Sequence, residues 1–517
     1  MSNINQLSGA IKFALFVGAT ASLASVSAFA QDTKEEAKEI GAVNVVGSRI
    51  KQVNKETAQP VQIVTREDIA KTGLNNVYDV LNNITASDGS GLSTVTTQTN
   101  GSDGSQQISL RGLGSGRTLV LVDGKRWVTD PSGTVDLSTI PLAIIERIEV
   151  LKDGASAIYG SDAIAGVVNI VTRRNYDGAQ AGVYYGQTNQ GDGAQTGADL
   201  TIGTQGEKSN TTFSISRTTQ DQILAGDRRQ SAFPYAYGCE DQLATPGGNL
   251  GAYCGSASGI YGRFVVPGTG TVALNHDSSG NPFADGVIDA ADFHVFNNLD
   301  RYNFAPINYL QQPAERLNVF ATTRYDLTDN ISLYGRVSYT KRTSTQQLAE
   351  VPLTISNTGA SGPPWIMNLA VNSIFNPFGQ QINTINSRMQ PVGPRTNHFD
   401  YDILATQLGA EGSFNLGDHL LNWDVYAQYN DGQYDQVGEN YINLFNLRNS
   451  LGQSGYDATP GRGFYCGASW ATRIVGCVPF NITGGPTLGL GATYAGHVIN
   501  QADVDAMVDY IRSEERR

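Results

Sequence analysis

The chain has 517 residues, and its 35 basic and 48 acidic side chains give a formal net charge of −13. A chain this acidic, without a cluster of lysine and arginine, has no electrostatic surface for nucleic acid, so we exclude nucleic-acid binding. Only 16% of the residues are charged, and 58 glycines with 23 tyrosines favour a mainly β protein of two structural units.

The first thirty residues predict a cleaved secretory signal. Residues 13–30 are apolar or small, follow Lys12 and end in Ala28-Phe29-Ala30, the small-x-small pattern that a signal peptidase needs. A transmembrane helix fits less well, because serine and threonine are frequent and no later segment approaches 18 continuous apolar residues. We therefore expect a signal peptide at 1–30 and an exported mature chain.

Residues 31–50 are expected to be a tether before the first folded unit. Residues 31–39 are polar and charged, which suits a flexible segment. The β-prone run that follows consists of Ile40, Gly41, Ala42, Val43, Asn44, Val45 and Val46. From the residues alone, this run is best interpreted as an ordinary first strand.

Two short helices and a long polar loop follow. Thr65 can cap a helix that Gly73 closes, and a second helix at residues 76–81 would bury Val77, Val80 and Leu81. Residues 87–107 are almost wholly polar or glycine. Loops of this length are uncommon inside a compact domain unless they are functional or flexible.

Two blocks of sequence carry the clearest pattern. Residues 108–126, ISLRGLGSGRTLVLVDGKR, place an Arg-Gly turn before an apolar strand that an Asp-Gly turn closes. Residues 145–174 join two alternating apolar runs through a segment rich in glycine, serine and alanine. Both blocks predict strands of a small globular domain.

The two blocks, in this order, resemble the plug domain of TonB-dependent outer-membrane receptors. The residues that match the family's motifs are Arg111, Gly112, Arg117, Asp123, Gly124, Glu146, Arg147, Glu149, Gly160, Gly166 and Asn169. The resemblance implies a plug domain at 51–176. It also implies that the polar loop, with residues 126–134, forms an apex facing the incoming ligand, although a merely flexible loop is an equal alternative.

The resemblance changes the interpretation of the run from Ile40 to Val46. Its position is that of the TonB box, which receptors of this family offer to the periplasmic protein TonB. An extended strand can add to the edge of a partner's sheet through main-chain hydrogen bonds, with Val43 and Val45 on one face. TonB is therefore the expected protein partner.

Four charged motif residues, Arg111, Glu146, Arg147 and Glu149, are candidates for an ion-pair cluster between the plug and a barrel wall. Such clusters are usually structural. In this family, however, displacement of the plug must break comparable contacts, so a role in gating is the alternative.

The second unit, residues 177–517, predicts transmembrane strands with one polar and one apolar face. At residues 331–342, Leu333, Val337 and Tyr339 alternate with Tyr334, Arg336 and Arg342. The strands expected on this pattern lie near 180–187, 197–205, 210–219, 314–327, 331–342, 401–414 and 419–430. The links are alternately short and long, which is typical of outer-membrane barrels.

The four cysteines form two local pairs in the long links, Cys239 with Cys254 and Cys466 with Cys477. Neither pair has the spacing of a zinc site, and an exported chain meets an oxidising compartment. Of the three pairings that four cysteines allow, the two local disulfides are the simplest expectation.

The strands found do not make a whole barrel. Transporters of the resembled family have 22 strands, and a barrel that holds a plug cannot close with seven. The residues after Asn430 are expected to be mostly loop, with Ser513 to Arg517 as a polar tail. We therefore expect a fragment, or a prematurely ended reading frame, that contains the plug and the N-terminal part of the barrel.

No enzyme, cofactor or metal site is predicted. The glycines at 112, 114 and 116 lack the Gly-Lys-Ser/Thr of a phosphate loop, and Gly114-Ser115-Gly116 lacks the strand-to-helix elbow of a hydrolase. Residues 281–292 imitate a calcium loop, but Phe283 occupies a position that needs an oxygen ligand. The five histidines are scattered along the chain.

The expected fold is mainly β, with a small α+β plug domain followed by an incomplete antiparallel transmembrane β-barrel. The resemblance implies a receptor in the outer membrane of a Gram-negative bacterium, in contact with its lipids, that takes up an unidentified siderophore, vitamin, oligosaccharide or peptide with energy from TonB. The alternative is a soluble periplasmic or secreted β-sandwich that binds a ligand.

Overall fold

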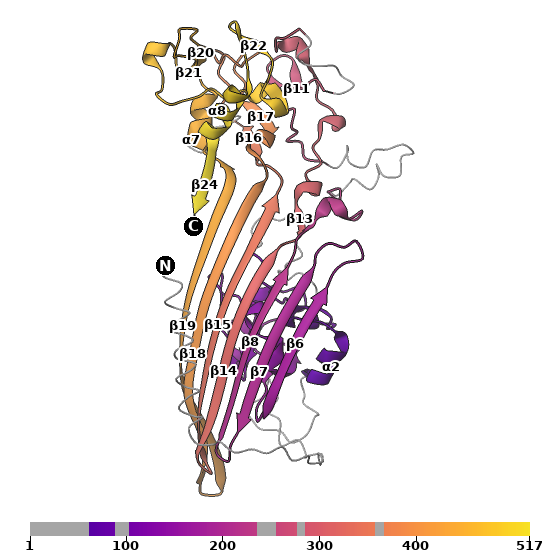
Figure 1. The fold of residues 1–517 in the computed structure, drawn as a ribbon, viewed down its shortest axis with the longest axis vertical. Coiled ribbons are helices and arrows are strands. Elements are labelled where there is room, and N and C mark those ends of the chain that lie inside the picture. Colours follow the sequence, from indigo (N-terminus) through magenta and orange to yellow (C-terminus); the bar gives the residue numbers. More distant parts are fainter. Residues whose placement is uncertain (1–60, 88–102, 235–254, 277–284, 357–366, 517) are drawn as a thin grey trace.

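The computed structural model describes residues 61–87, 103–234, 255–276, 285–356 and 367–516 (Figure 1). The expected signal peptide, the run from Ile40 to Val46, and the pair Cys239 and Cys254 lie outside the described residues. Within the described ranges, no helix is both long and apolar enough to cross a membrane. The chain is mainly β, with 46% strand and 18% helix.

The first unit is a small α+β domain built on a five-stranded sheet. Its strand order is β1-β4-β5-β2-β3, in which only β2 and β5 pair in parallel. The strands are β1 (Val61–Thr65), β2 (Thr118–Val122), β3 (Lys125–Arg126), β4 (Ile145–Leu151) and β5 (Gly166–Thr172). The helices are α2 (Arg66–Thr72), α3 (Val77–Asn82) and α4 (Ser156–Tyr159).

Local sequence signals explain the start of this domain. Thr65 and Asp68 form a reciprocal capping box at the start of α2, and Gly73 ends the helix in the left-handed conformation, as the sequence predicted. Asn76 caps α3, which buries Val77, Val80 and Leu81. Both helices are therefore confirmed to within one residue.

Gly166 begins β5 with a backbone angle φ of 140°, a conformation that residues other than glycine rarely adopt. A Cβ atom there would lie 2.5 Å from the carbonyl oxygen of Leu151 and 2.9 Å from Cδ1 of Leu110. We expect Gly166→Ala to lower the free energy of unfolding by about 1–3 kcal/mol, measured by denaturant titration. Gly116→Ala is the control, because a Cβ at Gly116 meets nothing within 4 Å; equal effects would contradict this account.

The second unit is dominated by an eight-stranded antiparallel sheet of order β24-β19-β18-β15-β14-β8-β7-β6. Its strands are β6 (Gly178–Gly186), β7 (Gln195–Gln205), β8 (Ser209–Gln220), β14 (Ala314–Thr328), β15 (Ile331–Leu348), β18 (Arg395–Leu416), β19 (His419–Ile442) and β24 (Arg512–Arg516). All seven expected strands are confirmed, and β15, β18 and β19 extend furthest beyond their expected bounds. The short links after β7, β14 and β18 lie together at one end of the sheet (Figure 1).

The last strand differs from the expectation. The sequence predicted a polar tail from Ser513, whereas β24 pairs with the far end of β19 through Val437 with Arg516 and Ile442 with Arg512. The strand lacks the apolar alternation that identified the other seven. Its pairing therefore depends on main-chain hydrogen bonds, which polar residues make as readily as apolar ones.

The two faces of the large sheet have different chemistry. One face carries exposed apolar side chains, of which Val183 is 91% and Val425 is 67% exposed. Residues paired on neighbouring strands share this face, for example Leu200 with Ile215 and Ile215 with Val319. The opposite face carries polar and charged side chains and packs on the first domain.

At the end with long links, the described residues of 255–308, 349–394 and 443–511 form a compact unit that we call the loop body (Figure 1). Its main sheet has the order β12-β11-β10-β17-β16. The strands are β10 (Arg263–Val266), β11 (Gly270–Leu274), β12 (Phe293–Val295), β16 (Pro352–Ser356) and β17 (Thr384–Arg388). Smaller pairs join β9 (Ile223–Leu224) to β13 (Tyr309–Gln311), β20 (Ser454–Tyr456) to β21 (Phe464–Cys466), and β22 (Thr493–Tyr494) to β23 (His497–Val498).

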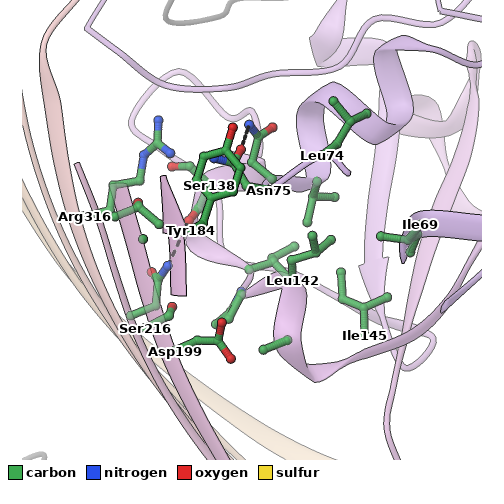
Figure 2. Close-up of a pocket in the computed structure, with 18 of the residues that line it drawn as sticks. Ile69, Leu74, Asn75, Ser138, Leu142, Ile145, Tyr184, Asp199, Ser216 and Arg316 are labelled. Atoms are coloured by element: carbon green, nitrogen blue, oxygen red, sulfur yellow. Dashed lines mark hydrogen bonds between the residues drawn. The ribbon is translucent and has the colours of Figure 1, made fainter. Parts of the chain in front are cut away.

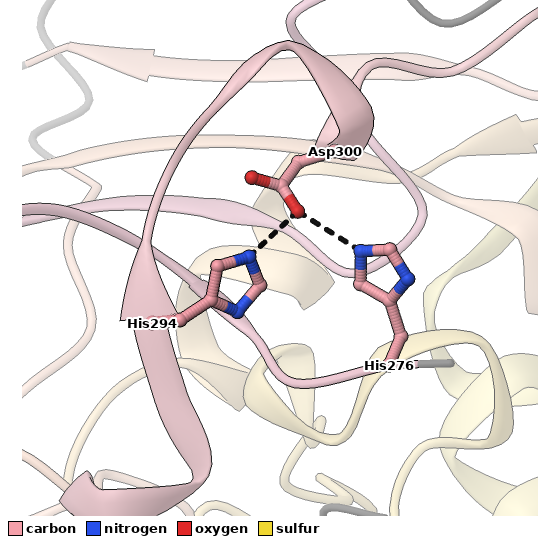
Figure 3. A group of neighbouring side chains, drawn as sticks. All are labelled: His276, His294 and Asp300. Atoms are coloured by element: carbon pink, nitrogen blue, oxygen red, sulfur yellow. Dashed lines mark hydrogen bonds and ion pairs between the residues drawn. The ribbon is translucent and has the colours of Figure 1, made fainter. Parts of the chain in front are cut away.

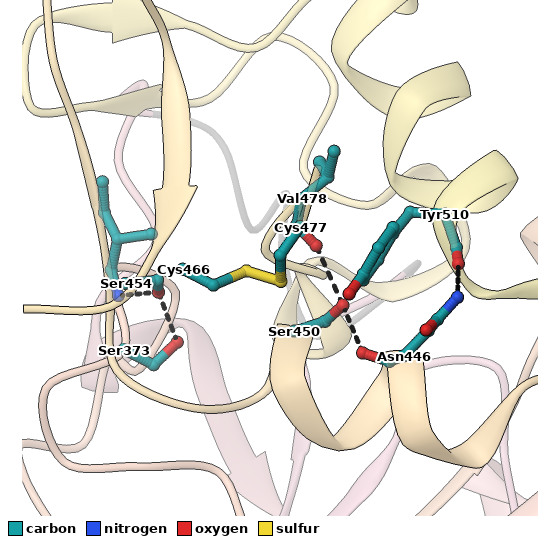
Figure 4. Close-up of a disulfide and its surroundings, with 9 residues drawn as sticks. Ser373, Asn446, Ser450, Ser454, Cys466, Cys477, Val478 and Tyr510 are labelled. Atoms are coloured by element: carbon teal, nitrogen blue, oxygen red, sulfur yellow. Dashed lines mark hydrogen bonds between the residues drawn. A yellow bond between two sulfur atoms is a disulfide. The ribbon is translucent and has the colours of Figure 1, made fainter. Parts of the chain in front are cut away.

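The loop body corrects the expectation of simple loops after Asn430. Helices α7 (Leu444–Ser450) and α8 (Gln501–Ile511) bury apolar side chains in a core that also contains Phe264 and Ile385. A disulfide joins Cys466 and Cys477, which is the local pairing expected from the sequence (Figure 4). Beside it, the hydroxyl of Ser450 donates to the carbonyl oxygens of Asn446 and Val478, so the end of α7 is fixed to the crosslinked segment.

Candidate functional site

The candidate site is the contact between the first domain and the polar face of the large sheet. Part of this contact is apolar, since Phe320 on β14 and Tyr401 and Ile403 on β18 share one hydrophobic core with the first domain. That core also contains Trp127 and Leu137. The domain and the sheet are therefore packed together rather than merely adjacent.

Arg342 on β15 makes the most extensive polar contact. Its side chain is buried, and Nη1 donates to the carbonyl oxygen of Asp103 at 2.6 Å. Nη2 lies 3.4 Å from the Asp103 carboxylate and Nε lies 3.3 Å from the Asp136 carboxylate. The second contact is an ion pair without hydrogen-bond geometry. One sheet arginine thus engages two carboxylates of the first domain.

Arg336, six residues earlier on β15, binds the turn between β2 and β3. Its Nη1 donates to the carbonyl oxygen of Val122 at 3.2 Å and lies 3.5 Å from the Asp123 carboxylate. The guanidinium also lies over the ring of Trp127, 5.0 Å from its centre. Both Asp123 and Gly124 have positive φ, so the predicted Asp-Gly turn presents the carbonyl and carboxylate together.

Arg316 on β14 is the third buried sheet arginine. Within the described part of the chain, its Nε and Nη2 atoms have no hydrogen-bond partner. It lines a cavity of about 330 Å³ between the domain and the sheet, with Asp199 and Ser216 on the sheet side and Leu74 and Leu142 on the domain side (Figure 2). The neighbouring Asn318 donates to the carbonyl oxygen of Ser138 at 3.3 Å.

A further ion pair lies nearer the end with short links. Lys125, which follows the Asp-Gly turn, pairs with Asp424 on β19 and lies over the ring of Tyr426, 4.4 Å from its centre. Tyr334 also donates to Asp424, at 2.7 Å. We call Arg316, Arg336 and Arg342 the sheet arginines. Together with Lys125 of the first domain, they place four basic side chains at the contact between the domain and the sheet.

The charged motif residues expected at this contact lie elsewhere. Arg147 pairs with the buried Glu149 at 2.9 Å, and Asn169 donates to Glu149 at 3.0 Å, all inside the first domain. Arg111 donates to the carbonyl oxygens of Ile164 and Ala165, and its nearest carboxylate is Asp153 at 3.8 Å. Glu146 is exposed. The predicted cluster is therefore wrong as a contact between domain and sheet.

The other motif residues shape the domain itself. Arg117 donates to the carbonyl oxygen of Leu113 at 2.9 Å, and Asn169 accepts from the backbone of Gly124 at 2.9 Å. Gly112 and Gly160 have φ of 70° and 90°, which favours glycine. These four residues therefore stabilise turns of the first domain, including the turn that contains Asp123 and the segment that leads into β5.

The sheet arginines were missed as contact residues because alternation shows which side chains share a face but not what covers that face. Arg316, Arg336 and Arg342 were all expected on the polar side of their strands. Water was the expected neighbour of that side. The useful signal is the residue type, because three arginines on one face of adjacent strands need carboxylates when that face is buried.

Asp103 makes the contact sensitive to acid. Burial raises the pKa of its carboxyl group. The charge of Arg342 and hydrogen bonds from Ser105 lower the pKa by more than burial raises it, so the pKa lies below its ordinary value of 3.8. Such a group stabilises the fold above its unfolded pKa and loses that effect as the pH falls through the folded pKa.

We therefore expect the contribution of Asp103 to the free energy of unfolding of the first domain to be constant between about pH 7 and pH 5 and to fall below about pH 4. The measurement is urea titration of the wild-type chain and Asp103→Asn at each pH. The difference between the two should shrink in acid. A difference that persists unchanged down to about pH 2 would contradict the assignment.

Comparison with known proteins identifies the first domain. The family model described as TonB-dependent Receptor Plug Domain matches residues 53–167. Among solved structures, the chain is similar to the siderophore receptor PirA from Pseudomonas aeruginosa, at 15% identity and a TM-score of 0.33, over 74% of this chain and 54% of that one. It is similar to the siderophore receptor PiuA from Acinetobacter baumannii, at 15% identity and a TM-score of 0.39, over 80% and 49%.

The ferric citrate transporter FecA in its unliganded form is also similar, at 15% identity and a TM-score of 0.37, over 74% of this chain and 49% of that one. The chain spans about half the length of these solved structures. The family match covers β2, β4 and the turns that bind the sheet arginines. This chain therefore carries, at residues 53–167, the plug domain of TonB-dependent receptors.

Proposed function

We propose that the chain belongs to a TonB-dependent receptor of the Gram-negative outer membrane, which takes up a nutrient ligand with energy from TonB. The observation that carries this proposal is a plug domain packed on the polar face of an antiparallel sheet whose other face exposes apolar side chains. Outer-membrane barrels need this division, because one face meets lipid and the other meets water or a plug.

The proposed parts follow the chain. Residues 1–30 are the signal peptide, 31–50 the periplasmic tether, 51–176 the plug and 177–517 the N-terminal part of the barrel with its extracellular loops. TonB pairs with the run from Ile40 to Val46 and pulls on the plug. Displacement then separates the sheet arginines from Asp103, Asp123 and Asp136, whose contacts support a holding role for this interface.

The ligand approaches from the side of the loop body. Siderophore, vitamin, oligosaccharide and peptide are the proposed ligand classes, and the loops are the proposed binding elements, since binding residues are concentrated on loops that a rigid scaffold positions. The proposed role is binding and transport without catalysis.

A soluble β-sandwich is the second candidate, and the apolar face argues against it. In a sandwich the apolar faces of two sheets cover each other. Here Val183, Tyr185 and Val425 on the outer face of the sheet are each more than 60% exposed. Exposed apolar area on this scale is typical of a surface that meets lipid or another protein.

Cell fractionation tests the membrane assignment. Expression of the full chain in a Gram-negative host should place it in the outer-membrane fraction, with electrophoretic mobility that changes on heating. Recovery as a monomer that salt alone releases from membranes would overturn the assignment and favour the sandwich.

A binding experiment tests the TonB contact separately. The C-terminal domain of TonB should retain the wild-type chain, whereas replacement of Val43 and Val45 by proline should abolish retention, because proline has no N–H for a sheet edge. The matched control replaces the same residues by threonine, which keeps the N–H groups and the β propensity. If the proline variant is retained as well as the wild-type chain, residues 40–46 are not the segment that binds TonB.

A further inference from the structure

The loop body brings two histidines and an aspartate together from three local elements. His276 lies two residues after the end of β11, and His294 is the middle residue of β12. Asp300 ends the 3-10 helix η8 (Asn298–Asp300). Antiparallel pairing of β11 and β12, with Ala273 opposite His294, brings the two histidines to the same end of the hairpin.

The ligand atoms of these residues converge on one point (Figure 3). The Nε2 atoms of His276 and His294 each lie 2.9 Å from the same atom, Oδ1 of Asp300. The Asp300 side chain is 1% exposed, whereas His276 and His294 are 14% and 23% exposed. The group is therefore anchored in the body on the carboxylate side and accessible on the imidazole side.

Neighbouring groups fix the orientation of two of the three side chains. Asn275 donates through Nδ2 to the carbonyl oxygen of Ala291, so its Oδ1 atom faces Nδ1 of His294 at 3.0 Å. An amide oxygen only accepts, so Nδ1 of His294 carries a hydrogen. The other oxygen of Asp300, Oδ2, accepts from the backbone of Asn297 at 2.6 Å, which leaves Oδ1 for the histidines.

This arrangement needs a proton or a metal cation between Nε2 of His294 and Oδ1 of Asp300. A neutral His294 with its hydrogen on Nδ1 has a lone pair on Nε2, directed at a carboxylate oxygen 2.9 Å away. Two acceptors at that distance repel each other. A proton shared by the two atoms or a metal cation removes the repulsion, and hydrogen bonding of the distal ring nitrogen is the usual support of a metal-bound histidine.

We propose that His276, His294 and Asp300 bind one divalent transition-metal ion, for which zinc is the best-suited probe. Two imidazole nitrogens and one carboxylate oxygen are donors that zinc accepts, while calcium and magnesium prefer oxygen alone. Donors about 2.1 Å from a tetrahedral zinc ion lie about 3.4 Å apart, so each Nε2–Oδ1 separation of 2.9 Å must widen by about 0.5 Å. Three protein ligands leave one position of a four-coordinate ion for a further ligand.

The site is distinct from the calcium loop considered in the sequence. Asp289 accepts from the backbone of Ala291 at 2.7 Å, and Asp292 accepts from the backbone of Asp289 at 2.9 Å, so both carboxylates cap a helical turn. Sequence spacing could not reveal the zinc ligands, because 18 and 6 residues separate them in an order that matches no common motif.

The test measures zinc binding to the full chain, purified in detergent and stripped with a chelator. Titration calorimetry should give one zinc ion per chain, and cobalt in its place should give visible absorption typical of nitrogen-ligated tetrahedral sites. His294→Gln and Asp300→Asn should each weaken zinc binding at least tenfold. His398→Gln is the matched control, because His398 faces Glu439 on the large sheet at 3.6 Å and should leave binding unchanged.

Asn275→Ala gives a second test that leaves all three ligands in place. Loss of the group that orients His294 should weaken zinc binding by about tenfold to a hundredfold, while the cobalt spectrum keeps its shape. Absence of saturable zinc uptake by the wild-type chain would overturn the proposal in favour of a protonated histidine-carboxylate triad. Uptake that persists unchanged in His294→Gln and Asp300→Asn would overturn it as well.

Discussion

Asp136→Asn is expected to lower the free energy of plug unfolding by about 3–5 kcal/mol, because it removes a charge that faces a buried guanidinium. Oδ2 of Asp136 lies 3.3 Å from Nε of Arg342, and both side chains are 2% exposed. Oδ1 accepts from the backbones of Gln106 and Ser138, at 2.9 and 3.0 Å, and an asparagine oxygen can continue to do so. The substitution therefore tests the charge and spares the local turn.

Trp127 is a suitable reporter, since it is buried in the plug core. Urea titration would follow its fluorescence in a background where Trp365, Trp423 and Trp470 are phenylalanine. The control is Asp162→Asn, which removes an ion pair with Arg126 at 2.5 Å whose side chains are about half exposed. We expect the control to cost less than about 1 kcal/mol. A similarly small cost for Asp136→Asn would show that the buried pair does not hold the plug.

Much of the fold follows from local signals. Alternation found the seven long strands of the sheet, and the cap residues Thr65 and Asn76 placed both early helices. The Asp-Gly pair at 123–124 was recognisable as a turn, because these two residues tolerate positive φ. Each of these features depends on residues close together in the chain.

The features that sequence reasoning missed depend on distant residues. The contact of Arg342 with Asp103 joins the sheet to a loop of the plug, and the loop body collects a core from three separate links. The strands of that body are only two to five residues long, too short for a period to emerge. The charged motif residues of the plug were assigned to the wrong surface for a different reason, since Glu149 pairs with Arg147 and Asn169 inside the domain itself.

Phe320→Ala tests the apolar half of the same contact. Phe320 is fully buried and belongs to the core that joins Tyr401 and Ile403 of the sheet to the plug. Its truncation leaves a cavity between the two units, and we expect a loss of about 3–5 kcal/mol in the Trp127 transition.

The neighbouring residue on β14 provides the control. Val319 points to the opposite face of the sheet, as the alternation of side chains along a strand requires, and lies outside the shared core. Val319→Ala should therefore shift the Trp127 transition by less than about 1 kcal/mol. If both alanine variants weaken the plug equally, Trp127 reports unfolding of the whole sheet. If Phe320→Ala alone weakens it, the plug is held by direct packing on β14 and β18, and its release must separate this apolar surface as well as the ion pairs.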